Sequence, residues 1–386
     1  MTSVKIGSKI RDIKPINMGQ DYFPTIFVNV GISERGDITH ELQKAKNAIS
    51  AGADIVSELS LTDNIADAQK YFLDELSVPV ASVAVYEAYL KAKKNDFKIS
   101  DEEVVRIFEN SAKRGIDVIT LHATVNRNDL DVMSQSKRII PTTSRGGAMM
   151  LKLMMANNYE NPYVTYFDDI LTIAAKYNVC LSLGPMYRAG AVTDCAIPND
   201  LDYLELERMS QLVARAQEKG VGIVIEGIGH ASLDKIKDFV PESIAKCNNA
   251  PYRVLTVATD IALGYDHISS SIAAANAVMY GASSITAVTR SEHIGHPSDS
   301  DVIEAVIAAK IAAHCGFSAR NKDFSRDMEM SLMRKQHGCI GNPALSICPN
   351  AVNKDKGMSL YVGQYSCNMC GEYCPFELIS QIKKGS

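Results

Sequence analysis

Three cysteines close to the C-terminus have a spacing that suits metal chemistry. Cys367, Cys370 and Cys374 are separated by two and then by three residues, and the run contains no fourth cysteine. A passive [4Fe-4S] electron carrier binds every iron through cysteine, and a structural zinc site uses four ligands. Three thiolates would instead leave one iron open to a reacting molecule. The spacing therefore favours a reactive cluster, with zinc or free or paired thiols as alternatives.

A second candidate metal site comes from two histidines in glycine-containing segments. His230 follows Glu226 by four residues, and His293 stands in a later segment that also follows a β-rich run. Two imidazoles from neighbouring loops can bind one zinc or iron ion and leave positions free for a small ligand. A single histidine is more often an ordinary core or surface residue. The histidines interpreted in that way are His40, His314 and His337.

The segment 141–147, Pro-Thr-Thr-Ser-Arg-Gly-Gly, has the composition of an anion site. It includes Ser144, Arg145 and Gly146 and precedes an apolar helix start at residue 148. Backbone N–H groups and the helix dipole would both favour a phosphate there. An ordinary N-capped loop is the alternative interpretation.

The elements that must position these residues alternate between short β-rich runs and longer helical periods. Such alternation is typical of a parallel sheet with crossover helices. Eight strands are predicted, at 25–30, 54–59, 80–85, 117–122, 178–183, 221–226, 254–258 and 284–289. Helices are predicted at 39–51, 64–76, 86–114 with a break near 95–96, 164–177, 201–219, 233–246, 266–281 and 300–315. Eight strands with eight crossovers indicate a closed (β/α)8 TIM barrel.

Polar residues gather where these predicted strands end. Asn29, the pair Ser57 and Glu58, His122 and Glu226 all lie at or near a strand end. Catalytic groups of barrel enzymes collect at that end of the strands. We therefore expect one active site at the mouth of the barrel.

Composition limits the remaining choices. The 386 residues divide into an irregular N-terminal arm at 1–20, the barrel at 21–320 and a C-terminal iron–sulfur cluster segment at 321–386. A formal charge of −5 gives no general attraction to nucleic acid, and no stretch approaches the roughly 20 apolar residues of a membrane span. Nine cysteines without a signal peptide indicate a reducing, cytoplasmic setting. No role can be assigned to Cys195, Cys339 and Cys348.

Several motifs together resemble one family. They are Thr143-Ser-Arg-Gly-Gly147, Ser182-Leu-Gly184, Ile225-Glu-Gly227 with Gly229-His230, Thr259-Asp-Ile-Ala262 with Gly264-Tyr-Asp-His-Ile268, Glu292-His293 and the terminal cysteine run. In this order they resemble the phosphomethylpyrimidine synthase family, also called thiamin pyrimidine synthases. A close relative is 5-hydroxybenzimidazole synthase. The resemblance extends over about residues 25 to 376.

The resemblance implies a radical S-adenosylmethionine carbon–carbon lyase. Cys367, Cys370 and Cys374 would hold a [4Fe-4S] cluster whose open iron chelates S-adenosylmethionine, while His230 and His293 would hold zinc or iron. One electron, from a donor such as flavodoxin or ferredoxin, would start a radical rearrangement of aminoimidazole ribotide. The family works as a homodimer in which the cluster segment covers the partner's active site. The residues that match family pocket positions are Asn29, Tyr86, His122, Ser144, Arg145, Gly146, Arg188 and Glu226.

Departures from the family pattern keep the substrate open. The second cysteine spacing has three residues instead of four, Pro185 replaces a pocket aspartate, Ser57 a methionine and Arg253 a tyrosine. The pocket thereby loses a carboxylate and gains a cation, which favours a changed substrate. The leading hypothesis is formation of 4-amino-5-hydroxymethyl-2-methylpyrimidine phosphate for thiamin. The alternatives are 5-hydroxybenzimidazole for cobamides, a paralogue with another substrate, or a non-catalytic cluster protein.

Overall fold

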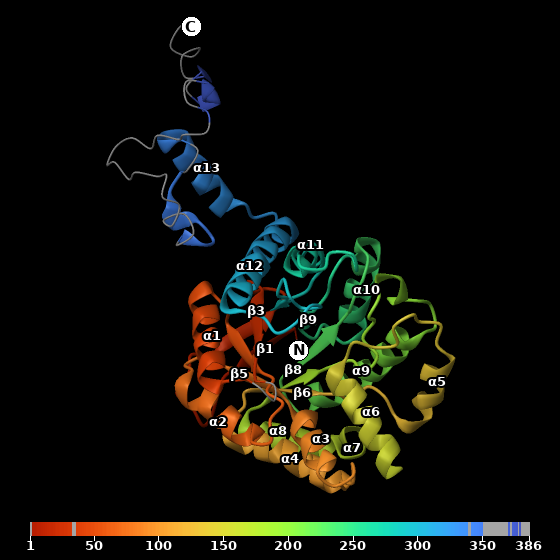
Figure 1. Ribbon diagram of the computed structural model, residues 1–386. Helices are drawn as coiled ribbons and strands as arrows, with labels where there is room; N and C mark the ends of the chain where they lie inside the picture. Colours follow the sequence, from red (N-terminus) through yellow and green to blue (C-terminus); the bar gives the residue numbers. More distant parts are fainter. Residues whose placement is uncertain are drawn as a thin grey trace. The chain divides into compact units, whose positions relative to one another are not determined.

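In the computed structural model, the chain forms a closed barrel of eight parallel strands surrounded by helices (Figure 1). The structure describes residues 2–32, 36–338, 341–349, 370, 373–376, 378 and 379. The barrel strands are β3 (Thr25–Val30), β4 (Ile55–Glu58), β5 (Val80–Val83), β6 (Val118–Leu121), β7 (Cys180–Leu183), β8 (Ile223–Gly227), β9 (Tyr252–Val254) and β10 (Ser284–Ala287). Each strand pairs with the next along the chain, and β10 closes the barrel against β3. The predicted (β/α)8 fold is confirmed.

One strand was misplaced in the prediction. The run 254–258 was expected to be the seventh strand, whereas β9 begins at Tyr252 and ends at Val254. Beyond that point the chain no longer pairs with a strand, because Thr256 donates its hydroxyl to the Gly229 carbonyl and Ala258 N donates to Ser269 Oγ of α11 at 3.0 Å. A buried charged residue, Arg253, interrupts the apolar pattern that would have marked the true strand.

The helices follow the strands in chain order. They are α1 (Ile38–Ala51), α2 (Ile65–Glu75), α3 (Ala84–Lys93), α4 (Asp101–Arg114), α5 (Leu130–Gln135), α6 (Arg145–Asn157), α7 (Pro162–Thr165), α8 (Phe167–Tyr177), α9 (Leu201–Glu218), α10 (Leu233–Lys246), α11 (Asp266–Met279) and α12 (Asp299–Asn321). Short 3-10 turns lie at η1 (Arg127–Asp129) and η2 (Val192–Asp194). The prediction lacked α5 and α7 and gave α6 only as a helix start.

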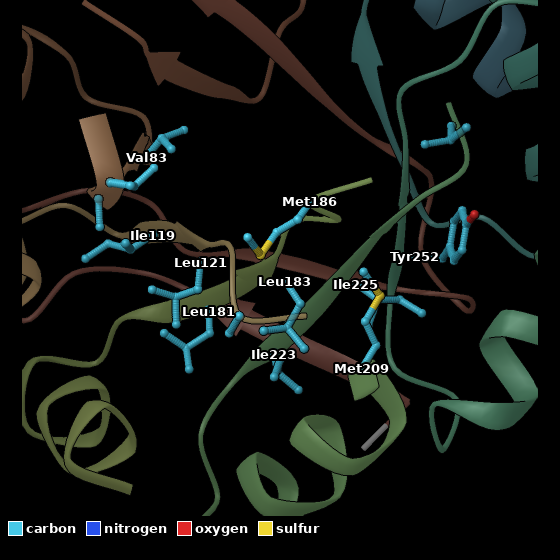
Figure 2. Close-up of a cluster of buried hydrophobic side chains, with 14 of the residues drawn as sticks. Val83, Ile119, Leu121, Leu181, Leu183, Met186, Met209, Ile223, Ile225 and Tyr252 are labelled. Carbon is cyan, nitrogen blue, oxygen red and sulfur yellow. The ribbon is translucent and has the colours of Figure 1, made fainter. Parts of the chain in front are cut away.

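The main core lies between the strands and these helices. Successive side chains of a strand point to opposite sides, so one set faces the helices and the other lines the barrel interior. Figure 2 shows part of the helix-facing set with Met209 of α9, namely Ile119, Leu121, Leu181, Leu183, Ile223 and Ile225. Among the alternate residues, Thr120 and Ser182 both donate to Glu226 inside the barrel. This alternation delivers the polar side chains to the site.

Residues 2–20 contain two paired strands, unlike the irregular arm expected from the sequence. β1 (Ser3–Ile6) pairs antiparallel with β2 (Ile16–Gly19). Its buried side chains form a second small core with residues from the starts of the barrel strands: Val4, Ile6, Met18, Phe27, Ile55, Ala81, Val118, Cys180 and Val224. The hairpin therefore closes the end of the barrel opposite the predicted active site.

α12 corrects the expectation about apolar stretches. This helix is long and apolar enough, by length and composition, to cross a membrane. Its buried residues are mostly small and belong to the main core: Val302, Ala305, Val306, Ala309, Ala312 and Ala313. Packing against the barrel accounts for this composition, as in the core helix of a folded domain.

The chain divides into two compact units after Arg320. In the second unit the structure describes α13 (Ser325–His337) and a 3-10 turn, η3 (Pro343–Leu345). Within it, Arg326 donates to the carbonyls of Leu345 and Ser346 at 3.0 and 3.3 Å.

Arg11 should be important for stability because it attaches the hairpin segment to the barrel. Its guanidinium pairs with the buried Asp117 and donates to three backbone carbonyls, those of Leu73, Leu76 and Val78. We expect Arg11→Met to lower the free energy of unfolding by about 3 kcal/mol, because an uncompensated carboxylate would stay buried. Urea denaturation provides the measurement. In the control Lys9→Met, which removes two exposed contacts, the loss should stay below about 1 kcal/mol. Equal losses in the two variants would contradict this role.

Candidate active site

A cavity of about 280 Å³ opens where the barrel strands end. It is lined by all the pocket residues predicted from the sequence, namely Asn29, Tyr86, His122, Ser144, Arg145, Gly146, Arg188 and Glu226. Ser57 and Arg253 also line it, whereas Pro185 lines a smaller cavity of about 20 Å³ behind it. The barrel thus gathers polar groups from β3 to β10 into one space.

Glu226, on β8, lies at the centre of this cavity's hydrogen bonds. Its Oε1 accepts from Thr120 Oγ1 at 3.0 Å and from Ser182 Oγ at 2.8 Å. Arg253 Nη2 also donates to Oε1, and Arg188 Nη2 donates to Oε2 at 2.7 Å. One carboxylate therefore binds two guanidinium groups and two hydroxyls.

The charges around Glu226 decide its protonation. Burial alone would raise the pKa of Glu226, but the positive charges of Arg253 and Arg188 lower it to about 2. His122 behaves differently, because burial lowers its pKa to about 4 despite the nearby Glu226 carboxylate. Near neutral pH the cavity thus holds an ionised Glu226 and an uncharged His122 imidazole. This imidazole can exchange hydrogen bonds with a substrate without adding charge.

Arg253 is buried beside Glu226. Its guanidinium carbon lies 4.5 Å from the centroid of the Phe27 ring, a cation–π geometry. Burial lowers the pKa of Arg253, but the adjacent Glu226 carboxylate opposes this shift. An arginine remains protonated in such surroundings, so this position supplies a fixed positive charge.

The start of α6 forms the anion-site segment. Ser144 is the N-cap, and its hydroxyl accepts a hydrogen bond from Gly147 N at 3.1 Å. A Cβ on Gly146 would lie 2.2 Å from the His122 ring, so only glycine allows this close approach. Burial raises the pKa of the nearby Tyr86 hydroxyl, although the Arg145 charge opposes the shift. Arg145 and the first turn of α6 can therefore bind a phosphate beside Tyr86.

The sequence did not lead us to expect a role for Glu205, which lies on α9. It is buried and accepts from Met186 N at 2.5 Å and from Tyr187 N at 2.9 Å, next to Arg188. The Thr124 hydroxyl also donates to it. Burial raises the pKa of Glu205 to about 7. The signal was a glutamate at helical spacing between the buried Leu201 and Met209.

His230 and His293 lie together beside the main cavity. Their ring centroids are 5.0 Å apart, and they line a cavity of about 100 Å³ that shares Arg188 with the larger one. His230 Nδ1 is 2.7 Å from Asp260 Oδ1, and His293 Nδ1 is 3.0 Å from Asp266 Oδ1. A carboxylate on Nδ1 is the usual support of a metal-binding imidazole and leaves Nε2 for the ion. This pair of rings therefore fits zinc or iron.

The described part of the chain contains no group of three or more His, Cys, Asp or Glu side chains arranged to hold a metal. The two imidazoles by themselves would leave further positions on such an ion open.

Another ionic cluster, also missed in the sequence, fixes the loop that carries His293. Glu41 and Lys44 of α1 are buried and 2.5 Å apart. Glu41 Oε1 lies 2.9 Å from His296 Nε2, and Lys44 donates to the Pro297 carbonyl at 2.8 Å. Glu41 also accepts from Gly31 N at 3.0 Å, so this cluster joins the loops after β3 and β10.

The predicted cluster cysteines are only partly described. Cys370 and Cys374 are partly exposed thiols, while Cys367 lies outside the described residues. Cys339 also lies outside them. Cys195 is buried, and burial raises the pKa of its thiol, as suits an inert core residue.

A closed parallel barrel with ionisable groups gathered in a cavity at the strand ends is the architecture of a barrel enzyme. Residues 3–381 match the model of the Radical SAM ThiC family. A phosphomethylpyrimidine synthase from Carboxydothermus hydrogenoformans is 37% identical over 96% of this chain and 88% of that protein. One from Caldanaerobacter subterraneus is 35% identical over 96% and 87%. The chain belongs to the Radical SAM ThiC family, whose chemistry implies an iron–sulfur cluster and S-adenosylmethionine.

Solved structures add only a weak resemblance. A dihydropteroate synthase from Coxiella burnetii has a TM-score of 0.47 and 14% identity, covering 81% of this chain and 98% of that chain. A resemblance of this size carries no argument about function.

The burial of His122 predicts a pH dependence of stability. The folded protein keeps this ring neutral down to about pH 4, whereas the unfolded chain takes up the proton near pH 6.5. At this ring the unfolded state therefore binds more protons between these values, and the contribution of His122 to stability is lost as the pH falls through this window. Urea denaturation gives the free energy of unfolding near pH 7 and near pH 5. Between these two pH values the wild type should lose about 2 kcal/mol more of this free energy than His122→Gln.

Glu226 contributes little to the change in stability between pH 7 and pH 5. The stability that its ionised carboxylate provides is lost only below the ordinary carboxyl pKa of about 4.5. The control His40→Gln changes an exposed ring and should keep the wild-type difference. An unchanged difference in His122→Gln would show that this histidine is not the group that titrates.

Proposed function

We propose that this enzyme is a radical S-adenosylmethionine lyase that rearranges aminoimidazole ribotide, or a close nucleotide, to 4-amino-5-hydroxymethyl-2-methylpyrimidine phosphate. The observation that carries the proposal is the polar cavity. It combines the start of α6, which suits a phosphate, with a charged floor formed by Arg188, Glu226 and Arg253. The curated relatives named phosphomethylpyrimidine synthase support it over nearly the whole chain.

The proposed roles follow from the contacts of each residue. Ser144 N-caps α6, and the first turn of this helix with Arg145 binds the phosphate. His122 and Tyr86 border the heterocycle and ribose, and Asn29 offers an amide from β3. Arg188 and Glu226 hold each other in position at the floor. Burial of Tyr86, His122 and Glu226 would help to keep water away from reactive intermediates.

Two metal groups belong to the proposal. Cys367, Cys370 and Cys374 would hold a [4Fe-4S] cluster, whose chemistry when bound is one-electron cleavage of the S-adenosylmethionine sulfonium. His230 and His293 would hold zinc or iron, since both rings have Nδ1 fixed by a carboxylate. We also propose a cytoplasmic homodimer that receives electrons from a flavodoxin or ferredoxin.

A second candidate keeps the radical chemistry but changes the substrate or product, for example to 5-hydroxybenzimidazole. Arg253 favours it, because this buried cation occupies the pocket floor where the family resemblance implies a tyrosine. Ser57, a small residue at a position implied to be methionine, also lines the cavity.

The reconstituted enzyme should convert aminoimidazole ribotide under anaerobic conditions with S-adenosylmethionine and dithionite. Mass spectrometry should detect 5′-deoxyadenosine together with the pyrimidine phosphate. Cys370→Ala should abolish both the cluster absorbance and 5′-deoxyadenosine, because a thiolate ligand is lost. Cys315→Ala, an exposed thiol on α12, should retain both. Activity in Cys370→Ala would contradict the cluster assignment, and the hydroxybenzimidazole mass would favour the second candidate.

His230→Ala should lower the zinc or iron content of the purified protein by about one ion per chain while leaving the cluster absorbance intact. Asp260→Asn should weaken metal binding by roughly 10- to 100-fold, since it removes the carboxylate that orients the His230 ring. Metal analysis after dialysis against a chelator gives the measurement. His40→Ala, on the surface of α1, is the matched control. Full metal content in His230→Ala would overturn this site.

A further inference from the structure

The floor of the main cavity offers many hydrogen-bond donors and few acceptors. A carboxylate has about four acceptor sites, and four protein donors already bind Glu226. Three of them share Oε1, so only Oε2 has capacity for a ligand. The protein itself therefore uses most of the hydrogen-bonding capacity of Glu226.

Donors at the same floor lack partners. Among the residues that the structure describes, Arg188 Nε, Arg253 Nε and Thr286 Oγ1 are buried without a hydrogen-bond partner. All three residues line the cavity. A buried polar group left unsatisfied costs about 1–3 kcal/mol, so a ligand that turns these side chains onto its own acceptor atoms would recover this free energy.

The charges at the floor of the cavity also favour a ligand with acceptor atoms. Arg188 and Arg253 bring two positive charges to the floor, and Glu226 compensates one of them. Of the other charged residues that line the cavity, Glu41 is paired with Lys44, and Arg145 and Glu292 have opposite signs. At the floor itself, Arg188 and Arg253 therefore exceed Glu226 by one positive charge. Desolvated excess charge favours an anionic ligand.

We propose that Arg253 is a specificity-determining residue that binds a carboxylate on the heterocycle of the substrate, as a second anionic group besides the phosphate. The preferred substrate class is thus a carboxylated imidazole ribonucleotide. This inference rests on the proposed function, which supplies the phosphate subsite and the imidazole nucleotide scaffold.

The test compares two ligands that differ by one carboxylate. Aminoimidazole ribotide and its 4-carboxy derivative are titrated calorimetrically, without reductant, into the full-length, cluster-reconstituted enzyme. The wild type should bind the carboxylated ligand at least about tenfold more tightly, which corresponds to about 1.4 kcal/mol. Arg253→Met should abolish this preference, and Arg253→Lys should retain part of it.

Arg320→Met is the matched control. This arginine is also partly buried, but it donates to the carbonyls of Gln20, Val278 and Ala282 away from the cavity. The ligand preference should therefore persist in this variant. Equal binding of both ligands by the wild type, or a preference for the uncarboxylated one, would overturn the role of Arg253 and leave the proposed function intact. Failure of both ligands to bind would overturn the substrate class itself.

Discussion

One carboxylate, Glu226, holds the interior of the active end together. Two arginines approach it from β9 and from the loop after β7; Arg253 is buried with it, and Arg188 is partly buried. Removing such charges from water costs several kcal/mol per ion, and hydrophobic residues of similar volume often stabilise a protein as well or better. Stability alone therefore does not explain why a barrel core should contain this cluster. Its position in the cavity does, because a low-dielectric site strengthens every interaction with a charged ligand.

Keeping this cluster in place constrains the surrounding residues. Arg188 stands on a loop whose backbone N–H groups donate to Glu205, so a second buried carboxylate supports the first one indirectly. Phe27 supports the Arg253 guanidinium from β3. Inside the barrel the neighbours of Glu226 are small hydroxyl residues, Thr120 and Ser182, which leave room for the cavity. The helix-facing side chains of the same strands are large and apolar, and they hold the strands rigid.

Much of this arrangement could be predicted, because strand and helix periods are local properties of a sequence. Seven of the eight barrel strands were found in place, β9 was misplaced, and polar residues at the strand ends indicated the pocket. The hairpin was missed although Ser3 to Ile6 alternates polar and apolar residues, because four residues give a weak signal. Glu205 and the pair Glu41 and Lys44 were missed for another reason. Charged residues on helices normally face water, and only the tertiary contacts show that these three are buried.

The two cavities at the barrel mouth share Arg188 and Glu292, although the histidines and the arginines have different carboxylate partners. Asp260 and Asp266 support the histidine pair, whereas Glu226 serves the arginines. Arg188 borders both spaces and holds Glu226 through a single nitrogen at 2.7 Å. An anionic group bound in either cavity would compete with Glu226 for the same guanidinium. A shift of Arg188 would then change both the charge of the floor and the wall of the histidine cavity. The two spaces are therefore better treated as one recognition unit than as independent sites.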